Sequence, residues 1–336
     1  MIARIHILLP YALTIPEKEP YHVYGYKYGG YIIRFFFPRK SEKADSYSGA
    51  DITKINGKVA MNADALHIEF QKKRFDRTNN KQTDPPLELI EEVTNDFMSR
   101  LRYATNASKV KLIKLSESNW TCTYLKDDGT ELKKDKRYLR ERGMRRFEFS
   151  YVALNNEIWE NINSIPPGYN LPAWKTLLLD AESILPEIGP AIVLTFTALE
   201  VFISKILDDI VKHSGIESDF WEWINNRGYL KEPSIEEKYD FLSSHLIGKS
   251  IKDDNQLWEA FKHIRRARNS FAHTGVAMIG EEIITIERTQ IFIKKAKEII
   301  EFIKNQIPEE LRWPEFNHQV QIEFIQKIME SKKKNS

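Results

Sequence analysis

The sequence contains only one cysteine, Cys122, among its 336 residues, so no disulfide can form within the chain. This scarcity favours a reducing compartment, and we expect the protein in the cytoplasm. No cysteine and histidine residues have the spacing of a zinc site, and we expect neither a metal nor another cofactor. The chain also lacks an excess of charge of one sign, because 50 Lys and Arg against 48 Asp and Glu give a net charge of +2. A nucleic-acid-binding surface would therefore be a local patch.

Long hydrophobic runs are scarce as well. The longest, Pro190–Ile203, is shorter than a membrane span and carries Glu200, so it is typical of a buried helix and we expect no membrane association. The N-terminal segment Met1–Pro16 alternates as a strand does and contains Pro10, which favours a mature strand over a signal peptide. Hydrophobic residues still make up 42% of the chain, which is enough for a packed core, and its length favours two domains.

Residues 1–163 predict a β-rich domain with one helix. A hairpin signal, Gly29-Gly30, interrupts an aromatic-rich stretch, and an Asp-Gly turn follows a later strand pattern. The helix is expected over Pro85–Thr105, where apolar residues recur every four positions. The expected strands, besides the N-terminal one, lie within Tyr21–Phe37, Lys109–Leu115, Trp120–Leu132 and Arg145–Leu154.

A linker is predicted at residues 164–172, where three prolines and a glycine oppose regular structure. Residues 173–330 then show helical periodicity, and residues 331–336 form a basic tail. The fold class is therefore α+β, with an N-terminal β-rich domain followed by an all-α helical bundle. The expected helices are Trp174–Leu185, Pro190–His213, Ile235–His245, Asn255–His273, Gln290–Gln306 and Val320–Glu330.

One of these helices, Asn255–His273, has an arginine where an apolar residue is expected. The residues on its apolar side are spaced by four, three, four and three positions, and Arg268 takes the fourth place. They are Leu257, Phe261, Ile264, Arg268 and Phe271, and we call this row the seam. A buried guanidinium needs a carboxylate, a ligand or a wet interface, because leaving it unpaired is costly. Asn269 and His273 lie four residues apart beside it, and Gly275 can end the helix. The pattern predicts a polar cluster over the last turn and a half.

The run Arg268-Asn269-Ser270-Phe271-Ala272-His273 reads R-N-x-x-x-H and resembles the R-x(4–6)-H signature of HEPN-domain proteins. The preceding helix, PAIVLTFTALEVFISKIL, is similar to the long A-L-E helix of the Apea-like HEPN group. The resemblance covers about residues 174–306. It implies a HEPN-like bundle of four or five helices that forms a homodimer, in which two motifs create one composite site. Many such proteins are metal-independent endoribonucleases of defence and toxin systems. Gly275 stands where HEPN toxins regulated by nucleotidyl transfer carry a tyrosine, so such regulation is not expected here.

The residue types suit RNA cleavage without a metal. Two copies of His273 can serve as base and acid, because histidine titrates near neutral pH. Arg268 can stabilise a phosphorane with a bidentate fork, and Asn269 can hold the phosphate or orient the histidine. Glu200 could support the site by pairing with Arg268, but the favoured interpretation is a structural role in an internal salt bridge, with Lys205 or another partner. The alternative for the motif is a salt-bridged arginine and a histidine stabilised by the helix dipole.

Basic residues near the motif and in the first domain are expected to contact RNA phosphates. The run Lys133–Arg146 holds eight basic and two acidic residues. The predicted RNA-binding residues are Arg265, Arg266, Lys133, Lys134, Arg137, Arg140, Arg145 and Arg146. The alternative for these residues is a solvated basic face.

Two other kinds of function remain open at this stage. One is a non-catalytic HEPN module that binds RNA, a nucleotide or a protein partner. The other is a structural helical assembly protein, in which Arg268 would be satisfied inside the monomer. In each case the β-rich domain is available to bind a regulatory protein or an effector ligand.

Overall fold

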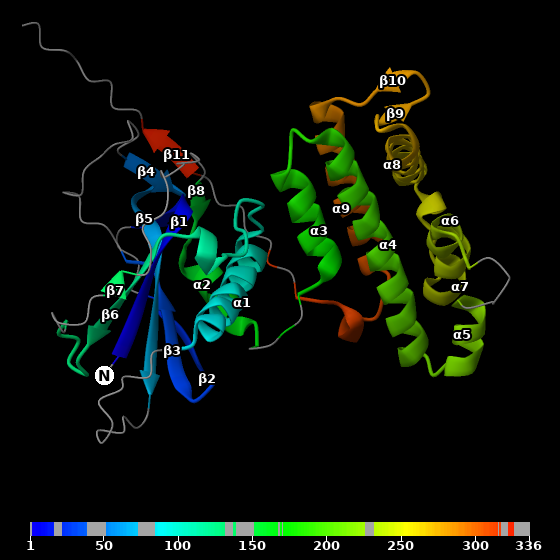
Figure 1. The fold of residues 1–336 in the computed structure, drawn as a ribbon. Helices are drawn as coiled ribbons and strands as arrows, with labels where there is room; N and C mark the ends of the chain where they lie inside the picture. The colour runs from blue at the N-terminus through cyan, green and yellow to red at the C-terminus, as the bar shows by residue number, and fades with distance from the viewer. Residues whose placement is uncertain are drawn as a thin grey trace, which may run out of the picture. The chain divides into compact units, whose positions relative to one another are not determined.

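The computed structural model describes residues 2–16, 22–38, 52–72, 85–131, 137–138, 151–166, 169, 171–225, 232–314, 316 and 322–325. The chain divides into two compact units, Met1–Asn170 with Phe316–Ser336, and Leu171–Glu315. The first unit contains a curled β-sheet with helices, and the second is helical apart from one short hairpin (Figure 1). The α+β class, with a β-rich part followed by a helical part, is confirmed.

Nine strands of the described residues form one sheet in the first unit. The two longest strands, β1 (Ile2–Pro16) and β5 (Lys58–Lys72), are antiparallel neighbours at its centre. Their register shifts between Leu8 and Leu13, so Pro10 lies where the regular pairing is interrupted. The other strands are β2 (Tyr24–Tyr28), β3 (Tyr31–Phe36), β4 (Ile52–Ile55), β6 (Trp120–Leu125), β7 (Arg137–Tyr138), β8 (Tyr151–Ala153) and β11 (Ile322–Ile325).

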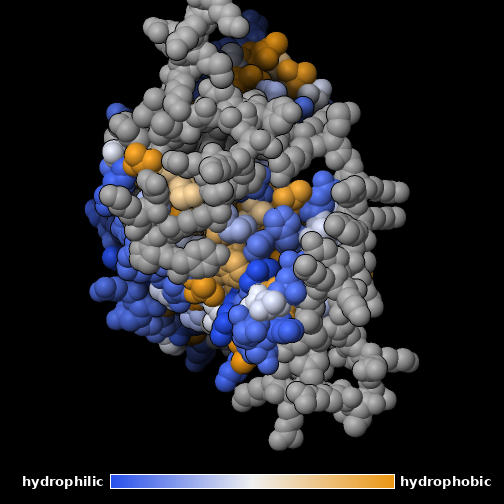
Figure 2. Space-filling view, turned by 90° about the vertical axis from the view of Figure 1, so that its left-hand side faces the viewer, coloured by the Kyte–Doolittle hydropathy of each residue, from blue (hydrophilic) through white to orange (hydrophobic). Residues whose placement is uncertain are grey.

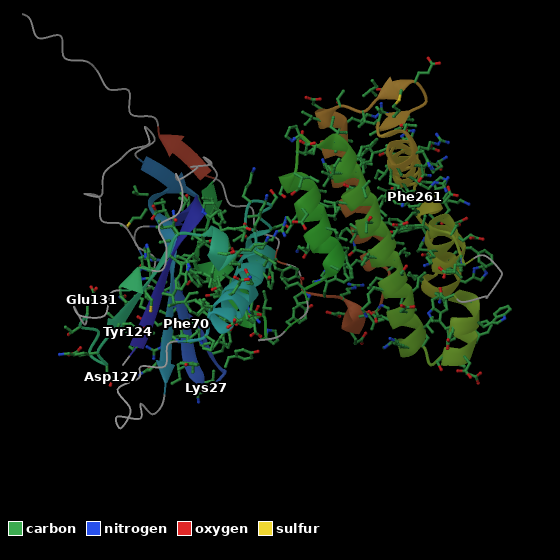
Figure 3. The ribbon with its side chains drawn as sticks, in the orientation of Figure 1. Lys27, Phe70, Tyr124, Asp127, Glu131 and Phe261 are labelled. Atoms are coloured by element: carbon green, nitrogen blue, oxygen red, sulfur yellow. The ribbon has the colours of Figure 1, made fainter. Side chains whose placement is uncertain are left out.

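The core of this unit lies between the sheet and two helices, α1 (Leu87–Thr105) and α2 (Asn156–Ser164) (Figure 1). Alternate residues of each strand face this core, as the two-residue period of a strand requires. Ala3 of β1 is paired with Phe70 of β5 on one side and with Tyr124 of β6 on the other, and all three side chains are buried. Phe70 and Tyr124 are labelled in Figure 3. Where the face of the molecule in Figure 2 is coloured, hydrophilic and apolar residues are mixed.

The hairpin predicted at Gly29-Gly30 is confirmed. Both glycines have positive φ values, 56° and 80°, and they connect β2 to β3 through a two-residue turn. Such a turn requires positive φ at both central positions, which glycine adopts without steric cost.

Two secondary-structure predictions are wrong. The segment Lys109–Leu115 alternates like a strand, but it forms no strand and leads into a 3-10 turn, Leu115–Glu117. Its backbone bonds to side chains of α1 instead: Asn95 accepts from the Ile113 N–H at 2.7 Å and donates to the Ile113 carbonyl at 3.0 Å. The backbone N–H and carbonyl of Ile113, which a neighbouring strand would have paired, are thereby satisfied.

The second wrong prediction is the helix over Val320–Glu330. Residues Ile322–Ile325 form strand β11, which pairs with β4 at an edge of the sheet. Phe316 packs edge-on against Tyr103 of α1, with the ring centroids 5.5 Å apart. The helical unit therefore ends at residue 315 and not at residue 330.

The second unit is built around α4 (Ile188–His213), which packs against α3, α8 and α9. Among the described residues α4 is the one helix long and apolar enough to cross a membrane, but its apolar side chains form the core of this unit, which is consistent with a soluble protein. The other helices are α3 (Ala173–Ser183), α5 (Ser218–Asn225), α6 (Ile235–Glu237), α7 (Ser243–Ile247), α8 (Asn255–Thr274) and α9 (Ile286–Lys304). A π-helical turn (Lys238–Leu242), two 3-10 turns (Ile251–Asp253 and Glu309–Leu311) and the hairpin β9–β10 (Met278–Ile279 and Glu282–Ile283) complete the unit.

A pair of histidines lies on the sheet face that is turned away from α1. His6 of β1 and His67 of β5 are opposite each other in register, and His6 Nδ1 is 2.6 Å from His67 Nε2. Phe36 packs edge-on against His67. Arg4 donates to Glu69, and these two residues form the next β1–β5 pair on the same face of the sheet. Burial, followed by the effects of His6 and Arg4, lowers the pKa of His67 to about 3.

This histidine should make the first unit sensitive to acid. An unfolded histidine has a pKa of about 6.5, so below that pH the unfolded chain binds a proton that the folded chain does not. The folded state therefore has its full stability with respect to His67 above about pH 6.5, where this histidine is neutral in both states. That contribution is lost as the pH falls from about 6.5 toward about 3. We expect the free energy of unfolding to fall by up to about 2 kcal/mol between about pH 6.5 and about pH 5 through His67.

Urea unfolding of the wild type and of His67→Gln at both pH values would measure this effect. The variant should lose less stability on acidification, because it has no imidazole at position 67. Parallel losses in the two proteins would contradict the assignment to His67.

Candidate functional site

The candidate site lies at the C-terminal end of α8. This helix begins at a side-chain cap, in which Asp254 accepts from the backbone N–H groups of Gln256 and Leu257 at 2.9 and 3.1 Å. It ends at Gly275, whose φ of 75° is left-handed and whose N–H donates to the Phe271 carbonyl at 2.8 Å. Both ends of the motif helix are thus defined by local hydrogen bonds.

The first three residues of the α8 seam are buried, and the last two are partly exposed. Leu257, Phe261 and Ile264 are buried, and Phe261 packs against rings of α4 and of the π-helical turn (Figure 3). Arg268 and Phe271, the next two members of the seam, are half-buried. Arg268 therefore lies at the rim of the core, where its guanidinium can reach a ligand.

Arg268 contacts an aromatic ring and a side-chain amide. Its Cζ lies 5.5 Å from the centroid of the Phe196 ring of α4, and its Nη1 donates to Asn269 Oδ1 at 3.1 Å. Within the described parts of the chain it forms no ion pair with a carboxylate. The guanidinium is positioned by an aromatic face and an amide, neither of which neutralises it.

His273 and Asn269 are exposed on another side of the same helix. His273 lies five positions after Arg268 in the α-helix, which corresponds to about 140° around the axis and about 7.5 Å along it. His273 forms no hydrogen bond with any residue that the structure describes. The structure brings Arg268 and Asn269 into contact, whereas His273, one turn after Asn269, forms no hydrogen bond with either of them.

Glu200 lies half-buried on α4, between two cations. Burial raises the pKa of its carboxyl group, while the charges of Arg268 and then Lys238 lower it. It forms no ion pair with either cation in the described structure. The suggested internal bridge to Lys205 is absent as well, since Lys205 pairs with Asp209. Glu200 is therefore close enough to Arg268 to affect it electrostatically, without holding it directly.

The two arginines before the motif differ in their surroundings. Arg265 forms an ion pair with Glu236 of α6 at 2.7 Å, so it connects two helices. Arg266 is exposed and has no ion pair within the described ranges. Its charge contributes, after the hydrogen bond from Lys262, to the lowered pKa of Glu259. Of the two, Arg266 is the one free to contact a phosphate.

The basic residues predicted in the first domain are mostly outside the described residues. This applies to Lys133, Lys134, Arg140, Arg145 and Arg146. Arg137 is in β7, where its backbone pairs with Cys122 of β6, and its side chain is not described.

Three neighbours of the motif were not identified from the sequence: Phe196 beneath Arg268, Lys238 near Glu200, and Gly189 beneath Phe271. The first two come from segments far from the motif in the chain, and only packing brings them together. The third had a local signal, the Gly-Pro pair at the start of α4, but that signal indicates only the beginning of a helix.

Gly189 lets α8 approach α4 closely. A Cβ atom at this position would lie 2.0 to 2.4 Å from three atoms of the Phe271 ring. We expect Gly189→Ala to lower the free energy of unfolding of the helical unit by about 1–3 kcal/mol, because Phe271 and the end of α8 must move. Thermal unfolding would measure the loss. Adding Phe271→Leu should recover part of it, and no recovery would show that the ring is not the obstacle.

Comparison of the chain with protein-family models, curated proteins and solved structures finds no match. In the stretches of chain that the structure describes, no three His, Cys, Asp or Glu side chains are grouped as a metal site would need. The argument for function therefore depends on the residues and geometry at the end of α8.

Proposed function

We propose that the chain is a metal-independent endoribonuclease of the HEPN type, which acts as a homodimer in the cytoplasm, in phage defence or a toxin-type stress response. The observation that carries the proposal is the environment of the Arg268 guanidinium. A half-buried guanidinium is held over Phe196 without a contacting carboxylate, one residue before Asn269 and five before His273. A phosphate is a ligand that such a group binds well, through two parallel hydrogen bonds.

The proposed reaction is a transphosphorylation within RNA. One His273 removes the proton of a 2′-hydroxyl, whose oxygen attacks the adjacent phosphorus, and the His273 of the second copy protonates the departing 5′-oxygen. Arg268 stabilises the charge of the phosphorane, and Asn269 keeps the guanidinium oriented through their hydrogen bond. The products carry a 2′,3′-cyclic phosphate and a 5′-hydroxyl.

Two features favour a homodimer. Arg268 and His273 lie on different sides of α8, so a second copy is needed to supply a histidine to the phosphate that Arg268 holds. Exposed apolar side chains also follow α8 directly in the chain, on and beside the hairpin β9–β10 and in the first turns of α9. They are Val276, Ile283, Ile286 and Ile291. These apolar side chains are available to pack against a second copy.

A second candidate function is a non-catalytic module that binds RNA. It is favoured by the exposure of His273 and by its lack of a hydrogen-bonding partner in the described chain, since catalytic histidines are usually oriented by a neighbour. Arg266 and Arg268 alone would suffice for binding phosphates. In both functions the first unit is available to bind a regulatory protein or an effector ligand.

Incubation of the protein with end-labelled RNA in EDTA separates the two candidates. The endoribonuclease should produce fragments with a cyclic phosphate, and its specific activity should fall on dilution below the dissociation constant of the dimer. Binding without cleavage at every protein concentration would support the module and reject the enzyme.

A further inference from the structure

Phe196, Glu200 and Ser204 follow one another at intervals of one turn along the same side of α4. The Arg268 guanidinium lies over the first, and Lys238 Nζ donates to the hydroxyl of the last at 3.0 Å. The carboxylate of Glu200 is thus flanked by two cations, one from α8 and one from the π-helical turn.

The position of Lys238 is built into the fold. Its neighbour Tyr239 is fully buried and donates to the Leu199 carbonyl of α4 at 2.9 Å. Ser243, the first residue of α7, donates to the Lys238 carbonyl at 2.7 Å. A π-helical turn is rare and often occurs at functional sites. Here it sets Lys238 against α4 one turn beyond Glu200.

The two cations compete for one carboxylate. If Glu200 paired fully with Arg268, the guanidinium fork would be occupied and its charge offset, and a phosphate would bind less tightly. Lys238 provides Glu200 with a second positive neighbour and so weakens its hold on Arg268. In agreement with this, Arg268 forms no ion pair with Glu200 in the described structure.

We propose that Lys238 is a positioning residue, whose positive charge near Glu200 weakens the attraction between that carboxylate and Arg268 and so leaves Arg268 free to bind an RNA phosphate. The inference rests on the proposed function, because it concerns the affinity of the same arginine for the same ligand. Lys238 itself does not contact the RNA.

The test uses the full-length His273→Ala protein, which should bind RNA without cleaving it, and a labelled single-stranded oligoribonucleotide of mixed sequence. We expect Lys238→Met to weaken RNA binding about tenfold, because Glu200 then pairs with Arg268. Glu200→Gln added to Lys238→Met should restore the affinity, since the competing carboxylate is gone. Lys238→Arg should keep the affinity close to that of the parent protein.

Lys294→Met is the matched control, because Lys294 is an exposed lysine of α9 whose loss changes the net charge equally. It should alter binding little, and the melting temperature of each variant shows whether the fold is retained. A loss in Lys238→Met that persists with Glu200→Gln would mean that the lysine contacts RNA or supports the fold, and would overturn the proposal. Binding that is insensitive to Lys238→Met would overturn it too. An absence of RNA binding in every variant and in the wild type would reject the proposed function itself, and this inference with it.

Discussion

Replacement of His273 by alanine is expected to lower the rate of RNA cleavage by a factor of about 10³ or more. Proton transfer by one positioned side chain contributes about 10² to 10⁴, and in a homodimer the single substitution removes both the base and the acid. RNA binding should persist, because Arg268 and Arg266 remain. The measurement is the single-turnover rate of cleavage of a labelled RNA at saturating protein.

His213→Ala is the matched control for this experiment. Like His273, His213 is an exposed histidine in the last turn of a helix, but it belongs to α4. Its loss should leave the rate unchanged. Arg268→Ala should lower the rate by about 10² to 10³, because an arginine that stabilises the developing charge is removed. Cleavage at the wild-type rate in both His273→Ala and Arg268→Ala would rule out the proposed mechanism.

The second large effect is expected in the first unit, at Arg100 of α1. This arginine is 1% exposed, and both nitrogens on one side of its fork donate to Asp96, at 2.9 and 3.1 Å. Its third bond goes to the Ile165 carbonyl, just after α2, and its Cζ lies 5.4 Å from the Tyr24 ring centroid. One side chain therefore joins α1, the end of α2 and the sheet.

We expect Arg100→Met to lower the free energy of unfolding of this unit by about 3–5 kcal/mol, because it leaves a carboxylate and a carbonyl without their buried partner. Hydrogen exchange of the α1 amides measures the opening of this unit. Arg34→Met is the control, because Arg34 is an exposed arginine of β3, and its loss should change stability by about 0.5 kcal/mol or less. Equal exchange rates in Arg100→Met and wild type would contradict this role.

The secondary structure was predicted well where the signal is local. The α8 seam, the α4 apolar run and the Gly29-Gly30 hairpin depend on periodicity or on glycine, and all three are confirmed. Helix α2 was not predicted, although Asn155 caps it and Ile158, Trp159 and Ile162 have helical spacing. That signal was present in the sequence and could have been used.

Predictions failed where distant residues decide the conformation. Lys109–Leu115 has the alternation of a strand, but Asn95 and Glu91 of α1 take up its backbone hydrogen bonds. Ile322–Ile325 forms a strand because β4 offers an edge more than 260 residues away in the chain. Pairing at such a separation leaves no periodic trace that a local pattern can reveal.

The sequence by itself determined the residues of the candidate site and their spacing: Arg268, Asn269 and His273 at the end of an amphipathic helix that Gly275 terminates. Only the tertiary structure decided the surroundings of the guanidinium. Phe196 beneath it, and Glu200 and Lys238 near it, come from other segments. The physical reason is that helix formation follows from neighbouring residues, whereas the charge and accessibility of Arg268 depend on groups that only packing brings together.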